Sequence, residues 1–116
     1  MSHFAKIPTQ FVHERELLEA LRELHGEQNV KVGGQIRGYY GKRTDVDISV
    51  RMPGEWDLGF RNEQGVYTLV KESMMTYDVQ NLVQSYAERV IANRLPRGKY
   101  RVLERDKGRI KLQQVT

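Results

Sequence analysis

The segment of this chain that is most similar to a ligand-binding loop contains four glycines between residues 33 and 41. They are Gly33, Gly34, Gly38 and Gly41. A phosphate-binding loop needs a Lys-Ser or Lys-Thr pair before a helix, and a dinucleotide-binding loop needs a helix directly after its glycines. Neither condition is met, because a strand pattern follows. The glycines are therefore predicted to serve the backbone, through positive φ angles or close approach between chain segments.

Asp47 and Asp57 are the acidic candidates for chemistry. They fall on the polar side of two adjacent predicted strands, where facing carboxylates could share a proton or hold a metal ion. Arg51 and Arg61 fall on the same polar side of these strands as the aspartates, so ion pairing between the strands is the simpler interpretation. No nucleophile and base accompany the aspartates, and the three histidines lack metal-binding spacing. No metal or cofactor is predicted.

Basic and aromatic residues gather at the glycine-rich bend and form the best candidate binding surface. Tyrosine and arginine side chains suit both stacking on nucleobases and docking of a protein. A second basic group lies near the C-terminus, where residues 94–111 include eight Lys or Arg residues and two acidic ones. The candidate residues for binding a protein partner or a nucleic acid are Arg37, Tyr39, Tyr40, Lys42, Arg43, Arg101, Arg105 and Lys107.

Composition limits the classes of protein to which the chain can belong. Its 116 residues carry a net charge of +4 and include no cysteine, which excludes disulfides, thiolate metal sites and a cysteine nucleophile. No apolar stretch approaches the roughly 20 residues that a membrane span needs, and the first residues do not resemble a signal peptide. We expect one domain over residues 1–116, located in the cytoplasm and not in a membrane.

Hydrophobic periodicity predicts a helix between two strands in the first part of the chain. Residues 3–9 favour an edge strand, because Pro8 cannot donate a hydrogen bond to a neighbouring strand. Leucines at helical spacing predict a helix over 14–25 that ends at Gly26. No residue typical of an N-cap precedes this helix, so its start is poorly specified. A short strand is expected at 29–32.

Two-residue alternation predicts hairpins in the middle of the chain. The expected core-facing residues are Val46, Ile48, Val50 and Met52 in one strand, and Trp56, Leu58 and Phe60 in the next. A turn at 62–65 leads into a third strand at 66–70. A second helix is expected to follow its N-cap Asp78 and to end at Pro96. Tyr86 lies in the apolar stripe of this helix, which predicts a buried ring with a hydrogen-bonded hydroxyl group.

The complete predicted order is β-α-β-β-β-β-α-β-β, and the last two strands, 100–105 and 109–115, form a terminal hairpin. Strands grouped in hairpins favour an antiparallel sheet. Two amphipathic helices must bury their apolar stripes against such a sheet. The predicted fold class is α+β, a two-layer sandwich of a mainly antiparallel sheet with both helices on one face.

Short motifs spread along the chain are similar to those of a known family. They are Met1-Ser2-His3-Phe4, Arg37-Gly38-Tyr39 with Gly41, Val46-Asp47-Ile48 with Arg51, Asp57-Leu58-Gly59-Phe60, Leu82 with Tyr86-Ala87, and Gly108-Arg109-Ile110-Lys111-Leu112. In order and spacing the motifs resemble the small family named for hypothetical chloroplast reading frame thirty-five, also catalogued as domain of unknown function twelve-fifty-seven. The resemblance extends over nearly the whole chain.

The resemblance implies an accessory role. The family has no established catalytic residues, and its members tend to be encoded near AAA-type ATPases, so such an ATPase is one candidate partner. This chain departs from the family pattern at two places. The tryptophan-rich stretch reads Lys71-Glu72-Ser73-Met74-Met75 here, and His13 replaces an aspartate before the first helix. A surface built from those tryptophans is therefore not expected.

Three functional hypotheses follow. The leading one is a non-enzymatic binding or accessory protein that engages a protein partner through residues 37–43 and the neighbouring strands. The alternative is a nucleic-acid-binding protein that uses the same bend together with the basic terminal hairpin. The weakest is an enzyme or metal protein that uses Asp47 and Asp57.

Overall fold

The computed structural model describes residues 3–95 in full and residues 100–106 and 109–114 through their backbone. The described helices are α1 (Glu14–His25) and α2 (Gln80–Arg94), and short 3-10 turns occupy Glu27–Asn29 and Tyr39–Gly41. The strands are β1 (Phe4–Ile7), β2 (Val30–Val32), β3 (Gln35–Arg37), β4 (Arg43–Asp45), β5 (Ile48–Val50), β6 (Leu58–Glu63), β7 (Val66–Glu72), β8 (Tyr100–Asp106) and β9 (Arg109–Gln114). Neither of these helices has the length and apolar content to cross a membrane.

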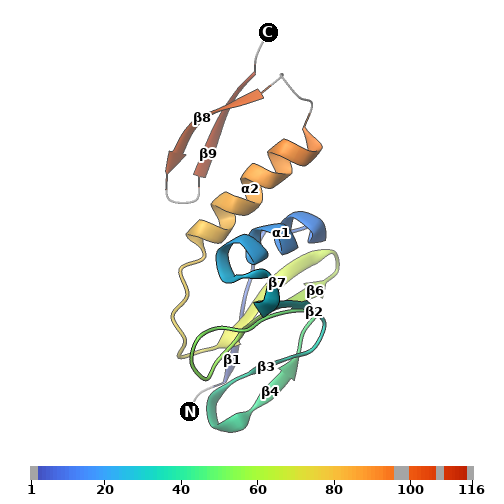
Figure 1. Ribbon diagram of the computed structural model, residues 1–116, viewed down its shortest axis with the longest axis vertical. Helices are drawn as coiled ribbons and strands as arrows, with labels where there is room; N and C mark the ends of the chain where they lie inside the picture. Colours follow the sequence, from blue (N-terminus) through green and yellow to red (C-terminus); the bar gives the residue numbers. More distant parts are fainter. Residues whose placement is uncertain (1–2, 96–99, 107–108, 115–116) are drawn as a thin grey trace.

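The centre of the fold is a five-stranded antiparallel sheet in the order β1-β7-β6-β5-β2. β6 and β7 form a long hairpin around a two-residue turn at Gln64 and Gly65, both of which have positive φ. α1 and α2 lie next to one another on one face of this sheet (Figure 1). The predicted α+β class, the mainly antiparallel sheet and the placement of both helices are confirmed.

The main hydrophobic core lies between the sheet and the two helices. It consists of Phe11, Leu17, Ala20, Leu21, Val30, Ile48, Val50, Leu58, Phe60, Tyr67, Leu69, Leu82 and Tyr86. Helical spacing in α1 and α2, and alternation in the strands, direct these side chains to the same side. Their burial is the main stabilising contribution, at roughly 25 cal/mol for each Å² of apolar surface removed from water.

The opposite face of the sheet carries a small β3–β4 hairpin, which the sequence patterns do not predict. Arg37 pairs with Arg43 at its closed end. Its Ile36 packs with Val70 of β7 and with Phe4 of β1 in a second, smaller core. Each strand of the hairpin has three residues, which is too short for alternation to be recognised. The sheet is thus covered on both faces, by helices on one and by this hairpin on the other.

A bend at Val46 and Asp47 contradicts the prediction that Val46 shares an apolar face with Ile48. Val46 packs with Ile36 in the second core, whereas Ile48 lies in the main core. Gly59 of β6 permits this arrangement, because a Cβ atom there would lie 2.5 Å from Val46 Cγ1 and 3.1 Å from Ile36 Cγ2. Glycine leaves the room that the hairpin needs to approach the sheet.

The start of α1 is held by a residue of α2. The Tyr86 hydroxyl oxygen accepts hydrogen bonds from the backbone N–H groups of Val12 and His13, each at 3.1 Å. The Tyr86 ring also packs edge-on against Phe11, with ring centroids 4.7 Å apart. These contacts confirm that Tyr86 is a core residue with a hydrogen-bonded hydroxyl group. They hold the two residues that lead into α1, whose first turn has no side-chain cap.

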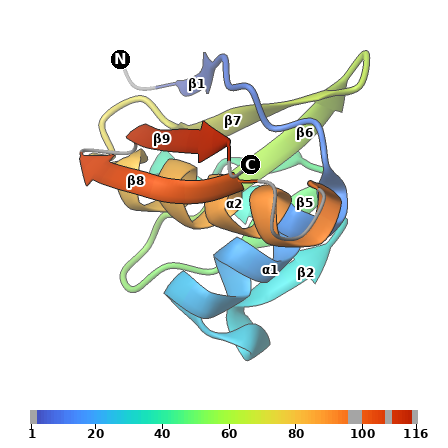
Figure 2. The same cartoon turned by 90° about the horizontal axis from the view of Figure 1, so that it is seen from above.

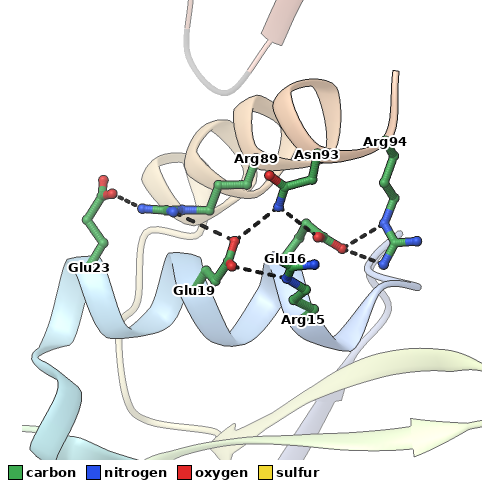
Figure 3. A network of polar contacts seen from close by, with 7 residues as sticks. All are labelled: Arg15, Glu16, Glu19, Glu23, Arg89, Asn93 and Arg94. Carbon is green, nitrogen blue, oxygen red and sulfur yellow. Dashed lines mark hydrogen bonds and ion pairs between the residues drawn. The ribbon is translucent and has the colours of Figure 1, made fainter. Parts of the chain in front are cut away.

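Polar contacts join the remaining length of the two helices (Figure 3). The buried carboxylate of Glu16 accepts hydrogen bonds from Asn93 Nδ2 at 2.9 Å and from Arg94 Nε at 2.7 Å. Further along α1, Arg89 forms ion pairs with Glu19 and Glu23. Burial acts to raise the pKa of Glu16, but the hydrogen bonds from Asn93 and Arg94 outweigh it and leave this pKa below its ordinary value.

The C-terminal strands β8 and β9 pair as an antiparallel hairpin, as predicted, with a register shift between Val102 and Glu104. This hairpin lies over α2 (Figure 2). α2 begins at Gln80 and its N-cap is Val79, so the predicted N-cap Asp78 is wrong by one residue. Asp78 Oδ1 still accepts a hydrogen bond from the Gln80 N–H, at 3.0 Å. The predicted stop at Pro96 lies outside the described residues, although α2 ends at Arg94.

Replacing Tyr86 by Phe should lower the free energy of unfolding by about 1–2 kcal/mol, because two backbone N–H groups lose their acceptor while the ring is kept. Urea denaturation of both proteins measures this difference. Tyr40→Phe is the control, since it removes the hydroxyl group of an exposed side chain and should change stability by less than about 0.5 kcal/mol. Equal effects of the two substitutions would contradict the role given to Tyr86.

Replacing Gly59 by Ala should cost about 1–3 kcal/mol of stability, because the added methyl group overlaps Val46 Cγ1. Urea denaturation of Gly59→Ala, Val46→Ala and the double variant forms a complete cycle. Once Val46 is Ala, the substitution at position 59 should cost much less than it does alone. Simple addition of the two losses would show that Gly59 acts through something other than this close approach.

Candidate functional site

The five candidate residues of the bend meet at the closed end of the β3–β4 hairpin. The 3-10 turn Tyr39–Gly41 forms this end, where the Gly38 N–H donates to the Lys42 carbonyl at 2.8 Å. Tyr40 has a φ of 55°, in the left-handed region, and the residue is 88% exposed. A bulky residue rarely adopts this conformation. The hairpin therefore presents Tyr40 to solvent from a tight and unusual turn.

Glycines shape this region in both of the ways predicted from the sequence. Gly33, Gly34 and Gly41 have positive φ angles of 83°, 92° and 71°. Gly38 is different, because a Cβ atom there would lie 2.6 Å from Phe4 Cζ and 2.9 Å from a carboxylate oxygen of Glu72. The first three allow the chain to turn, and Gly38 lets the hairpin lie against the sheet.

Arg37 forms the strongest polar contact of the hairpin, with Asp57. Arg37 Nη2 donates to Asp57 Oδ1 at 2.8 Å, and Arg37 Nε donates to Asp57 Oδ2 at 2.9 Å. The backbone N–H of Arg37 also donates to Oδ2 at 2.9 Å, and the Asp57 N–H returns a bond to the Arg37 carbonyl at 3.1 Å. The two side chains are 25% and 8% exposed. Arg37 is thus engaged in holding the hairpin.

The predicted ion-pair partners of the two aspartates are wrong. Asp57 pairs with Arg37, which precedes it by 20 residues, and not with an arginine of the adjacent strand. Arg61 donates to Thr44 Oγ1 and to the Asp45 carbonyl. Asp47 accepts the Asn62 N–H at 2.6 Å. Each aspartate has a structural partner of its own, and the described residues contain no cluster of three or more His, Asp or Glu side chains able to hold a metal ion.

The Arg37–Asp57 pair also sets the protonation of the aspartate. Burial acts to raise the pKa of Asp57, but the hydrogen bonds from Arg37 and from the Met52 N–H outweigh it and leave the pKa below its ordinary value. The hydrogen bond with Asp57 raises the pKa of Arg37. Both groups are therefore charged at neutral pH, and the pair is a charge-assisted, bidentate contact.

Glu72 is a second anchor that the sequence reasoning missed. Its side chain is fully buried, and its Oε2 accepts the backbone N–H of Tyr39 at 3.0 Å. Two residues before it in β7, Val70 packs under the hairpin in the second core. The two-residue period of a strand places Glu72 on that same side, which is the signal that could have identified it.

Three aromatic rings lie together at the end of the hairpin, and we call Tyr39, Tyr40 and Trp56 the aromatic tip. The ring centroid of Tyr39 lies 4.2 Å from the ring centroid of Tyr40 and 6.2 Å from that of Trp56. The prediction that Trp56 faces the main core is wrong, because it is half-buried here and precedes β6. A hydrogen bond with Tyr40 raises the pKa of Tyr39.

The predicted basic residues do not form one surface. Lys42 and Arg43 are exposed beside the aromatic tip. Positions 101 and 105 lie in β8, at the opposite end of the molecule from the β3–β4 hairpin (Figure 1). The side chains of Arg101 and Arg105, and all of Lys107, lie outside the described residues. The structure therefore brings together the candidates at 37–43 and separates them from β8.

Asp57→Asn should destabilise the protein at neutral pH by about 2–3 kcal/mol, because the charge-assisted bonds to Arg37 weaken. A lowered pKa means that the contribution of the carboxylate is present above the ordinary aspartate value of about 3.9 and is lost as the pH falls through the folded-state value. Urea denaturation at a series of pH values should show the two proteins converging in acid. Asp45→Asn, on the same hairpin but exposed, is the control and should have a small effect. A constant gap at every pH would contradict this account.

Comparison with known proteins gives the chain a family. No solved structure matches it. The family model described as "Protein of unknown function (DUF1257)" matches residues 20–115, which include the whole β3–β4 hairpin. The uncharacterized protein ycf35 of Cyanophora paradoxa is 32% identical over 103 residues, which cover 78% of this chain and 76% of the relative. The resemblance seen in the sequence motifs is confirmed, and the chain belongs to the DUF1257 family of proteins of unknown function.

Proposed function

We propose that this protein is a non-enzymatic accessory protein that docks a protein partner on its aromatic tip. The observation that carries this proposal is Tyr40, a residue that is 88% exposed and has a positive φ. Glycine or asparagine would adopt that conformation at lower cost. Unusual backbone conformations gather at functional sites, where a side chain is needed for something other than stability. Tyr40 fits the role of a contact residue.

The hairpin holds the aromatic tip rigidly. Asp57 fixes the backbone at Arg37, and Glu72 fixes it at Tyr39. A surface that is ordered before binding loses less conformational entropy when the partner arrives. Tyrosine and tryptophan are also the residues that most often dominate the binding energy of protein interfaces. Rigidity and residue type both favour a docking surface.

The surroundings of the aromatic tip indicate the character of the partner. A hollow of about 350 Å³ lies beside it, lined by Arg37, Gly38, Tyr39, Tyr40, Gly41, Arg43 and Glu55. Asp57 balances the charge of Arg37, so the lining adds one cation, Arg43, and one anion, Glu55, and the exposed Lys42 follows the turn. Oppositely charged rims speed association and help to select partners. The complementary surface therefore has an apolar or aromatic centre and carries charges of both signs around it. We propose an AAA-type ATPase as one candidate partner with such a surface.

Tyr40→Gly separates binding from folding. Glycine suits the positive φ at this position, so the variant should be at least as stable as the native chain while it loses the partner. The measurement is co-purification from cells at native expression, with quantitative mass spectrometry and thermal unfolding. We expect a stoichiometric partner on the native chain and at least about tenfold less on Tyr40→Gly.

Gln64→Gly is the matched control, because Gln64 also has positive φ, at 59°, in the turn between β6 and β7. It should retain the partner fully. The proposal fails if the native chain captures no stoichiometric protein, or if both variants capture it equally. Capture that disappears after nuclease treatment would instead identify the partner as nucleic acid.

A further inference from the structure

A second hollow lies between the β3–β4 hairpin and the β2–β5 edge of the main sheet. Its volume is about 290 Å³, and the basic residues that line it are Lys31, Arg37, Arg43 and Arg51. Ser49 and Gln35 add a hydroxyl and an amide group. The hollow is small for a large organic ligand but sufficient for an anion and the group that carries it.

Strand pairing explains why these residues converge. Lys31 of β2 is the register partner of Ser49 in β5, so both side chains lie on the same face of the sheet. Arg51 follows Ser49 by two residues and is held in place by its N–H bond to the Asn29 carbonyl, at 2.8 Å. Arg43, the register partner of Arg37, approaches from the hairpin. Four separate segments thus supply one lining.

The positive charges of this lining are not balanced. Asp57 is the one carboxylate among the lining residues, and Arg37 already neutralises it through the bidentate pair. Lys31, Arg43 and Arg51 are exposed, and within residues 3–95 they form no ion pair. Three like charges around one hollow repel one another, so their charges do not stabilise the fold. Such an arrangement is stabilised by an anion.

We propose that this hollow binds a phosphate group. Arginine matches the geometry of phosphate with its planar fork, and lysine supplies a compact positive charge. Ser49 offers a neutral donor at the same place, while one N–H of the Gln35 amide already donates to Asp45 Oδ1 at 2.9 Å. Arg37 and Arg43 line both this hollow and the one beside the aromatic tip. A nucleotide whose phosphate lies here can therefore extend its base toward Tyr39 and Tyr40, where aromatic stacking is available.

The test is a titration of the isotope-labelled full chain, followed by NMR at low ionic strength, with sodium phosphate and then with adenosine monophosphate. We expect shifts concentrated at the backbone amides of Lys31, Ser49 and Arg51, and weaker binding as salt is added. No shift at these amides at millimolar phosphate, or shifts spread evenly over the basic surface, would overturn the proposal.

Variants locate the site. The double variant Lys31→Gln/Arg51→Gln should bind phosphate at least about tenfold more weakly. Lys6→Gln is the matched control, because it removes one exposed charge from β1, at the other edge of the same sheet. It should bind within about twofold of the native chain. All substituted residues are exposed, so the fold should persist, and thermal unfolding verifies this. Equal weakening by the double variant and by Lys6→Gln would contradict a local site.

The choice of phosphate compound identifies the source of the group. Adenosine monophosphate that binds more tightly than inorganic phosphate, with added shifts at Tyr39 and Tyr40, indicates a free nucleotide. A short single-stranded oligonucleotide that binds more tightly still indicates a nucleic-acid backbone. Equal binding of all three indicates a simple phosphate anion. This site does not depend on Tyr40, so the Tyr40→Gly variant should bind inorganic phosphate normally.

Discussion

The ion pair between Arg37 and Asp57 is the contact on which the candidate binding face depends. It joins the end of β3 to the residue before β6. Besides the two hydrogen bonds between the side chains, the Arg37 N–H donates to the Asp57 carboxylate and the Asp57 N–H donates to the Arg37 carbonyl. The hairpin is too short to be stable alone, since two strands of three residues bury little surface. Fixed by this pair, the hairpin forms one wall of two hollows and carries Tyr39 and Tyr40 of the aromatic tip. One buried aspartate therefore determines the shape of a whole face.

Buried carboxylates act in the same way elsewhere in the described chain. Glu72 holds the backbone of the hairpin, and Glu16 holds the end of α2 against α1. Each accepts hydrogen bonds from donors far away in the sequence, so each contact is satisfied in one arrangement of the chain. Apolar packing alone tolerates small shifts between layers. These polar contacts fix the position of one layer relative to the next. An exact relative position matters most on a binding face.

How much of this could be read from the sequence differed from element to element. The leucines of α1 predicted a helix and Gly26 predicted its end, whereas no capping residue marked its start. The buried Tyr86 with a bonded hydroxyl group followed from its place in an apolar stripe. The fold class followed from the hairpin spacing. The alternating pattern placed Val46 on the wrong face, because a bend after it turns its side chain to the other face of the sheet. The bend leaves the alternation of apolar and polar residues in the sequence unchanged. The partner of Asp57 lies on an element that the patterns do not predict. The hollow that we propose to bind phosphate combines four segments, so no local motif could indicate it.

The bond from the Tyr86 hydroxyl group to the segment before α1 has a consequence for biosynthesis. The residues that lead into the first helix are held by the second, and β1 pairs with β7 rather than with a strand near it in sequence. Contacts between distant segments slow folding, because a long loop must close before they form. On the ribosome, the N-terminal quarter of this protein is synthesised long before its partners exist. Its native structure is therefore completed late, once α2 has left the exit tunnel.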